Sequence, residues 1–160
     1  MSTTPLNERV LNAFSQSFAR ALFAIYPQWR EFAELDEDHH TSTKFLVVIV
    51  KPPEASRADH PLVITTDNEE VTVGFDYYHN HLEWPPPDSE FGNPLRFISD
   101  ILSERIAIAS FWRDEVWLGS QYVNAGVTDL PPFSNQARLL RLRSWNGTFS
   151  TDLPARSPGP

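Results

Sequence analysis

A run of six apolar residues between two lysines is the feature that most limits how this chain can fold. The segment Lys44 to Lys51 reads KFLVVIVK, which is β-branched and continuous rather than alternating. This pattern is typical of a central strand buried on both faces of a sheet. Pro52 and Pro53 follow directly, and we expect the strand to end there.

A β-hairpin is predicted next. Leu62–Thr66 and Glu69–Tyr77 flank Asp67-Asn68, a two-residue turn whose residues tolerate positive φ. The second arm alternates, so that its apolar residues share one face of the sheet. They are Val71, Val73, Phe75 and Tyr77.

A second hairpin and a last strand are expected in the C-terminal third. Ile106–Trp112 and Val116–Val123 form the arms of the hairpin, around Arg113-Asp114-Glu115. The last strand runs through Arg138–Trp145, and Asn146-Gly147 is a turn signal after it.

The first predicted helix begins at Thr4, its N-cap, with Pro5 in the first helical position. Apolar residues then recur at spacings of three and four, which places them on one helix face. They are Leu11, Phe14, Phe18, Leu22 and Ile25. Pro27 disfavours helical geometry at Tyr26 and ends the helix. A short second helical stretch is expected to carry Trp29, Phe32 and Leu35.

Asn93-Pro94 repeats the cap and proline of a helix start. The apolar stripe of this helix is Leu95, Ile98, Ile101 and Leu102. The expected order is therefore α-β-β-β-α-β-β-β, an α+β fold with an antiparallel sheet of about six strands and two main helices on one face. The length fits one domain over residues 1–153. Residues 154–160 are rich in Pro, Ser and Gly, and we expect a disordered tail there.

The chain contains no cysteine, which excludes a disulfide framework, a thiol nucleophile and a Cys-ligated zinc site. Residues Met1 to Glu8 have no basic or apolar region of the kind found in signal peptides. The longest apolar run has six residues, far short of the ~20 that span a bilayer. These features predict a cytoplasmic protein that does not act at a membrane.

Acidic residues gather in the middle of the sequence. The formal net charge is −8, and between Asp67 and Asp100 eight acids face one base, Arg96. An acidic segment repels phosphates, which argues against nucleic acid as a partner, and it favours a basic protein. The alternative is that the acids serve only solubility.

Two histidines and a carboxylate lie at alternate positions near a strand end. If the strand stays regular, His79, His81 and Glu83 point to the same side as Phe75 and Tyr77. Such a set can hold a divalent metal, although a functional site needs further ligands. The interpretation we favour is a polar, aromatic rim of a binding surface, and structural histidines are a third possibility.

No sequence motif in the chain names a reaction. Dinucleotide-binding, Walker, nucleophile-elbow and His-Glu-x-x-His motifs are all absent from the sequence. The string His79-Asn80-His81 lacks the ββα-metal spacing of HNH nucleases. Asp114-Glu115 is expected to be a turn rather than an acid/base pair. We therefore predict no catalytic residues, no metal and no cofactor.

The stretch Val71–Trp84 alternates as a strand and then reads Gly-Phe-Asp-Tyr-Tyr-His-Asn-His before its tryptophan. In this it resembles immunity proteins of bacterial polymorphic-toxin and contact-dependent growth inhibition systems, as does the small, acidic, cysteine-free α+β layout. The resemblance implies a cytosolic protein that binds a cognate toxin domain and blocks it. Many such toxins are nucleases with basic surfaces.

The expected binding surface follows from the same stretch. Its carboxylates would steer a basic partner, while the histidines and Trp84 would be desolvated at the centre. The predicted partner-binding residues are Asp76, Tyr78, His79, His81, Glu83, Trp84, Asp88 and Glu90. Arg138, Arg141 and Arg143 would contact the partner from elsewhere or line a solvated strand.

Two other functions stay open at this point. One is a metal-dependent hydrolase that uses the His-x-His-x-Glu set, and metal analysis distinguishes it. The other is a phage- or secretion-associated adaptor that oligomerises, and the mass in solution separates it from a monomeric inhibitor.

Overall fold

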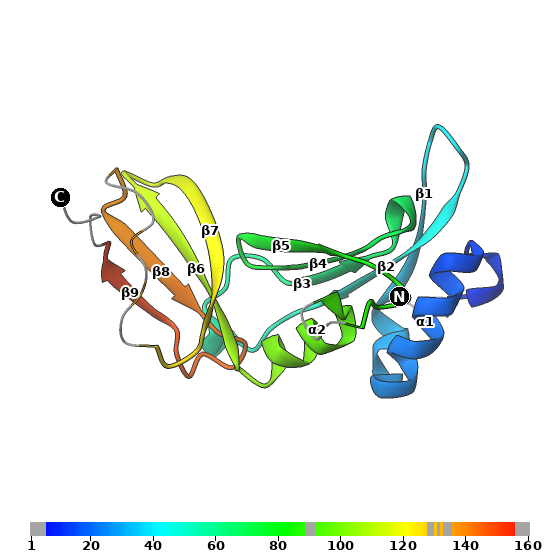
Figure 1. Ribbon diagram of the computed structural model, residues 1–160, viewed down its shortest axis with the longest axis horizontal. Helices are drawn as coiled ribbons and strands as arrows, with labels where there is room; N and C mark the ends of the chain where they lie inside the picture. The colour runs from blue at the N-terminus through cyan, green and yellow to red at the C-terminus, as the bar shows by residue number, and fades with distance from the viewer. Residues whose placement is uncertain (1–5, 89–91, 128–129, 131, 133–135, 156–160) are drawn as a thin grey trace. The chain divides into compact units, whose positions relative to one another are not determined.

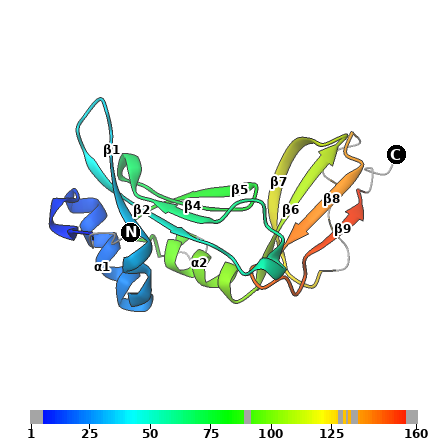
Figure 2. The same cartoon turned by 180° about the vertical axis from the view of Figure 1, so that it is seen from behind.

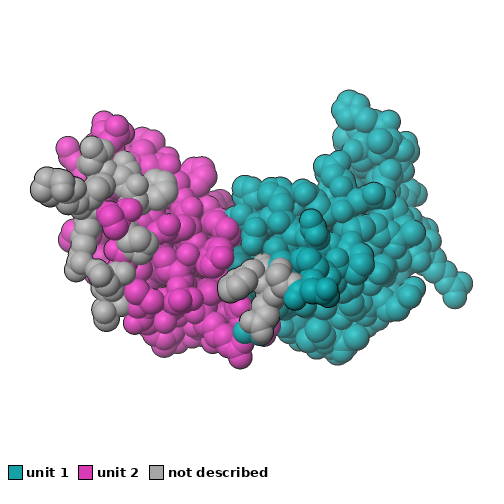
Figure 3. Space-filling model, in the orientation of Figure 1, with its two compact units in different colours: residues 1–51, 62–74, 79–98 teal, residues 52–61, 75–78, 99–160 magenta. Residues whose placement is uncertain are grey.

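A computed structural model describes residues 6–88, 92–127, 130, 132 and 136–155. The chain forms two compact units that interleave in sequence (Figure 3). Unit 1 consists of residues 1–51, 62–74 and 79–98, and unit 2 of residues 52–61, 75–78 and 99–160. Neither unit is a continuous segment, so no single cut in the chain separates them.

The fold is α+β, but its strands form two antiparallel sheets rather than the expected single sheet of about six strands (Figure 1). The first sheet has five strands in the order β1-β2-β3-β4-β5. They are β1 (Ala33–Glu37), β2 (Lys44–Val50), β3 (Leu62–Thr65), β4 (Val71–Phe75) and β5 (Tyr78–Leu82). The second sheet has four strands in the order β7-β6-β8-β9. They are β6 (Ile106–Arg113), β7 (Val116–Asn124), β8 (Leu139–Arg143) and β9 (Thr151–Pro154).

The apolar run forms β2, which lies between β1 and β3. Leu46 and Val48 are fully buried, whereas Ile49 on the other face is 40% exposed. The prediction that this strand is buried on both faces is therefore wrong at Ile49. The β-branched composition did predict the strand correctly.

Helix α1 spans Ala13–Ile25 and begins at Asn12, whose side-chain oxygen accepts a hydrogen bond from the Ser15 N–H at 2.7 Å. The Asn12 N–H donates to the Lys44 carbonyl at 2.9 Å, which ties the helix start to β2. The predicted start at Thr4-Pro5 lies outside the described residues, and residues 8–10 form a separate 3-10 turn. The helix begins later than predicted because Asn12 supplies a stronger cap.

Strand β1 was missed by the sequence analysis. The expected helical stretch exists only as a 3-10 helix, Pro27–Phe32, and the chain then enters β1. Leu35 lies opposite Leu46 in the β1–β2 pair. Pairing with a partner distant in sequence overrides the local three-residue spacing here.

The hairpin of β3 and β4 is confirmed, as is the alternation of β4, in which Val71, Val73 and Phe75 are buried. The chain then reverses at Asp76-Tyr77 and returns as β5, the other strand that the sequence analysis missed in this sheet. Because the strand does not continue, His81 faces Thr72 rather than the side of Phe75. The predicted shared face of Phe75, His79 and His81 is therefore wrong.

The second sheet contains the predicted hairpin of β6 and β7 and the predicted last strand, now β8. Beyond the Asn146-Gly147 turn the chain adds β9, which pairs with β8 (Figure 1 and Figure 2). Pro154 lies opposite Leu139, and the Ala155 N–H donates to the Arg138 carbonyl at 3.1 Å. The ordered chain therefore reaches past the expected tail boundary, and residues 156–160 lie outside the described residues.

Helix α2 spans Pro94–Leu102, as predicted. The Asn93 side chain accepts from the Leu95 N–H at 3.0 Å, and Ile98 and Ile101 are buried. Across the described residues, neither helix has the length and apolar character to cross a bilayer.

Gly147 offers a test of the second unit's packing. Its φ is +84°, and a Cβ built there would overlap the Ala55 carbonyl group. We expect Gly147→Ala to lower the free energy of unfolding by ~1–2 kcal/mol for the positive φ and a further ~1–3 kcal/mol for the overlap. Urea denaturation measures this.

Gly126→Ala is the matched control. Its φ is +80°, but a Cβ there would meet only the Phe149 ring at 3.5 Å, an ordinary contact. Equal losses for the two variants would contradict the close approach of Gly147 to Ala55.

Candidate functional site

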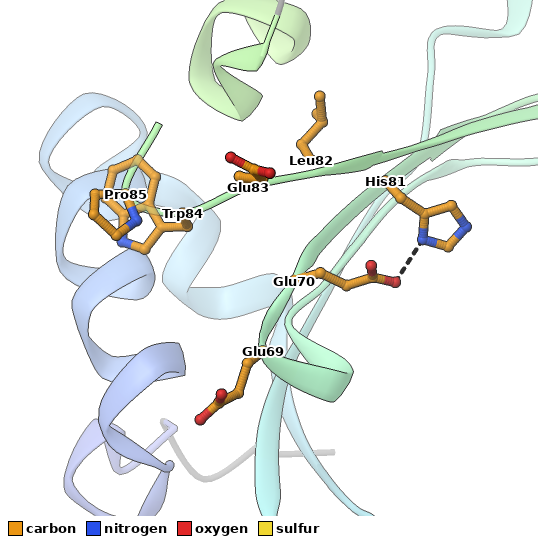
Figure 4. Close-up of a pocket in the computed structure, with 7 residues that line it drawn as sticks. All are labelled: Glu69, Glu70, His81, Leu82, Glu83, Trp84 and Pro85. Carbon is orange, nitrogen blue, oxygen red and sulfur yellow. Dashed lines mark hydrogen bonds and ion pairs between the residues drawn. The ribbon is translucent and has the colours of Figure 1, made fainter. Parts of the chain in front are cut away.

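A pocket of about 460 Å³ lies in unit 1, between the turn that precedes β4 and the end of β5 (Figure 4). The residues that line it are Glu69, Glu70, His81, Leu82, Glu83, Trp84 and Pro85. Three of the predicted partner-binding residues, His81, Glu83 and Trp84, therefore come together. Three carboxylates, one imidazole and one indole give the pocket a polar, acidic lining.

Backbone geometry places the first carboxylate. Asn68 and Glu69 both have φ of 55°, so the centre of the hairpin turn is left-handed at two successive residues. This is the geometry that the right-handed twist of a two-stranded hairpin favours. The predicted turn at Asp67-Asn68 is thus displaced by one residue, and the displacement puts Glu69 on the pocket wall.

Glu70 and His81 form the second part of the lining. The His81 Nδ1 lies 2.6 Å from Glu70 Oε1 and 3.1 Å from Thr72 Oγ1. Both side chains are about half exposed, so the pair contributes little to stability. Its consequence is geometric, because it holds the imidazole ring and the Glu70 carboxylate in one orientation, as Figure 4 shows.

Trp84 forms the aromatic wall of the pocket and contacts two residues of α1. Its indole Nε1 donates to Ser17 Oγ at 3.1 Å. Its ring meets the fully buried Phe18 ring edge-on, with 5.2 Å between centroids and an angle of 81°. The indole is partly buried, and its ring and its N–H both have partners in α1. A large aromatic ring with a satisfied N–H and a partly exposed face is typical of an interface anchor.

The histidines and Glu83 do not converge in the way a metal site requires. The centroids of the His79 and His81 rings lie 5.1 Å apart, and the rings meet edge-on. Figure 4 shows the Glu83 carboxylate turned away from the His81 ring. In the part of the chain that the structure describes, no three His, Asp or Glu side chains are arranged to hold a metal ion.

Asp76, another predicted partner-binding residue, is 8% exposed and belongs to unit 2. Its carboxylate accepts a hydrogen bond from the Asp59 N–H at 2.9 Å, and its own N–H donates to the His60 carbonyl. Burial raises the pKa of Asp76, and the nearby charge of Asp59 adds to this, while the Asp59 hydrogen bond and the Arg143 charge oppose it. Asp76 therefore ties two loops together and offers little charge to a partner.

The remaining predicted residues are scattered. The Tyr78 ring meets Tyr122 in unit 2, with 5.5 Å between centroids, and burial raises the pKa of Tyr78. Asp88 is exposed, and Glu90 lies outside the described residues. Neither Tyr78 nor Asp88 lines the pocket.

The C-terminal arginines serve unit 2 itself. Arg143 is buried and its guanidinium lies 2.7 Å from the Asp152 carboxylate. Arg141 stacks on the Trp112 ring at 4.2 Å from its centroid. Arg138 is exposed, with Asp114 at 3.7 Å. They do not form one solvated face.

Glu69 and Glu70 are the charged pocket residues that the sequence analysis did not select, and Leu82 and Pro85 are the apolar ones. They were counted in the acidic segment, but their role depends on β5 returning beside β4. The signal that would have found them is the left-handed turn at Asn68-Glu69, next to strand β4, which pairs with β5 as well as with β3.

Comparisons with family models, with curated proteins and with solved structures gave no match. The functional argument therefore rests on the pocket and its contacts.

The buried carboxylate gives a pH-dependent prediction. Because the folded-state pKa of Asp76 is raised, the folded protein binds this proton more tightly than the unfolded chain. The resulting stabilisation is present below the unfolded pKa of about 3.9 and is lost as the pH rises through the folded value. At pH 7 the ionised carboxylate therefore costs stability.

Asparagine keeps an acceptor for the Asp59 N–H. We therefore expect the free energy of unfolding of Asp76→Asn at pH 7 to equal or exceed that of the unsubstituted protein. The gain should shrink as the pH falls toward 4, as urea denaturation at both values would measure. Asp76→Ala is the contrast, since it leaves the Asp59 N–H without its acceptor and should be less stable than Asp76→Asn by roughly 1–3 kcal/mol at either pH. A large loss with asparagine at pH 7 that disappears at pH 4 would contradict the sign.

Proposed function

We propose that this chain is a binding protein of the immunity type, which neutralises a cognate toxin domain by occupying its surface. In this proposal the chain catalyses no reaction. It acts by covering the active site of the toxin or by blocking access of the substrate. The pocket of unit 1 is the docking point, and it accepts a basic side chain of the partner.

The observation that carries the proposal is the fixed Trp84 beside acidic groups. The indole is held by Ser17 and Phe18, and Glu69, Glu70 and Glu83 line the same pocket. A lysine or arginine side chain placed there meets carboxylates that match its charge and an aromatic wall that attracts cations. A cationic side chain is therefore the complement of this pocket.

The charge of the whole chain supports the same partner. A net charge of −8 attracts a basic protein over a distance of about one Debye length, roughly 8–10 Å at physiological salt. Toxin domains that act on nucleic acid need basic surfaces for their own substrate. An acidic inhibitor that covers such a surface would exclude the phosphates directly.

The first experiment tests whether this chain protects a bacterial host from the toxin domain. The proposal expects a large secreted protein to be encoded next to this gene, and the probe is the C-terminal domain of that protein. That domain is expressed in a bacterial host with and without this chain. The proposal expects growth only when the chain is present, together with a complex of the two purified proteins. A domain that is toxic in both cases and forms no complex would contradict it.

The pocket acids should control the association rate. We expect Glu69→Gln with Glu83→Gln to lower the on-rate by roughly 10-fold at low salt and to weaken its salt dependence, because exposed charges steer the encounter. Stopped-flow association with the toxin domain measures this. The matched control is Glu34→Gln with Glu37→Gln, which removes the same charge from β1 at the opposite edge of the sheet. Equal effects from both double variants would assign the steering to net charge rather than to the pocket.

Trp84 should control dissociation. We expect Trp84→Ala to speed dissociation by at least roughly 10-fold, about 1.4 kcal/mol, because a desolvated aromatic anchor contributes after docking. The control is Ser17→Ala, which removes the hydrogen bond from the indole but keeps the ring, and its effect should be smaller. Surface-immobilised binding gives both off-rates. An unchanged off-rate for Trp84→Ala would remove Trp84 from the interface.

A further inference from the structure

Strand β7 forms one edge of the second sheet (Figure 1 and Figure 2). It pairs with β6 on one side, and within the described part of the chain no strand pairs with its other side. A strand edge presents backbone N–H and C=O groups that can pair with another chain. Natural proteins usually protect such edges with charge, proline, short length or a bulge.

The other three sheet edges carry such protection. Strand β1 holds three acids in five residues, Glu34, Asp36 and Glu37. Strand β9 has four residues, among them Asp152, and ends at Pro154. Strand β5 is short, with five residues, and Glu83 follows it directly.

Strand β7 differs from all of these. Its nine residues, VWLGSQYVN, include no charged residue and no proline. Large apolar side chains stay partly exposed along it: Val116 is 61%, Trp117 48% and Tyr122 43% exposed. The Trp117 and Tyr122 rings also meet those of Tyr77 and Tyr78, respectively. The strand has one bulge, where Phe111 lies opposite Gly119 and Trp112 opposite Trp117. From Gly119 to Asn124 the pairing with β6 is regular, so a long regular edge remains.

We propose that β7 pairs in antiparallel fashion with β7 of a second copy of this chain and joins the two four-stranded sheets in a dimer. Antiparallel pairing of one strand with itself is the isologous contact of a twofold dimer. Such pairing sets a strand against its own sequence, so any charge near its centre would oppose a like charge. The uncharged composition of β7 avoids this cost.

The same composition argues against a basic protein as the occupant of this edge. A strand that receives a basic partner gains from acidic side chains, and β7 has none, although the chain as a whole has a charge of −8. Two copies of such a chain repel each other in general. An uncharged edge is where they can approach at least cost.

The experiment places charge at the middle of the regular edge. Gln121 lies between Gly119 and Val123 and is partly exposed. Sedimentation of the unsubstituted protein should give a mass of twice 18.3 kDa at high concentration. Gln121→Lys and Gln121→Glu should each sediment as monomers, because each puts like charges close together across the twofold axis. An equal mixture of the two should recover the dimer.

The control is Leu153→Lys, which adds a charge to β9 at the other edge of the sheet and should leave the dimer intact. Melting curves show that the variants are folded. A monomeric unsubstituted protein at all concentrations would overturn the proposal, as would single-charge variants that stay dimeric or a mixture that stays monomeric.

This inference is independent of the proposed function. No residue of β7 lines the pocket in unit 1. A dimer without toxin binding, or toxin binding by a monomer, would separate the two.

Discussion

The reversal of the chain at Asp76-Tyr77 is the constraint on which the site depends. It ends β4 and begins β5, and so brings His81 opposite Thr72 and beside Glu70. The reversal needs a left-handed residue, and Asp76 takes that conformation with φ of 52°. Aspartate tolerates it better than most residues, because its short side chain can bond to nearby backbone. The Asp76 carboxylate accepts instead from the Asp59 N–H, 17 residues away in sequence, at 2.9 Å, a contact made at the cost of burying a carboxylate.

Acidic residues that lie close together in the sequence have different roles in the fold. Asp76 is buried as a structural acceptor, and Asp100 lies 3.3 Å from the guanidinium of Arg105. The acids that remain together are those brought by the turn before β4 and by the end of β5, which line the pocket. The acidic segment therefore contributes three carboxylates to the pocket of unit 1, but it does not form one continuous acidic face.

Local signals in the sequence predicted the local structure. The two hairpins and α2 form in the predicted segments, with the turn before β4 displaced by one residue, because each depends on contacts between neighbouring segments. Strands β1 and β9 were missed because their signals are weak: AELDE and TDLP become strands only by pairing with β2 and β8. The division into two sheets was missed for the same reason. At the site, His81, Glu83 and Trp84 were identified from composition, whereas Glu69 and Glu70 required knowledge that β5 returns beside β4.

The pocket is built before any partner arrives, and this bears on how it can act. The turn geometry places Glu69, the contact with His81 holds Glu70, and α1 holds Trp84 through Ser17 and Phe18. Each side chain ordered in advance lowers the cost of binding, which is about 0.5–1.5 kcal/mol for every flexible side chain that must be fixed. These interactions contribute little to the stability of the fold, since the Glu70–His81 pair is about half exposed and the Ser17 hydroxyl lies at the surface. Under the proposed function, an indole and two carboxylates that are placed around one cavity before binding would lower the cost of recognising a basic side chain.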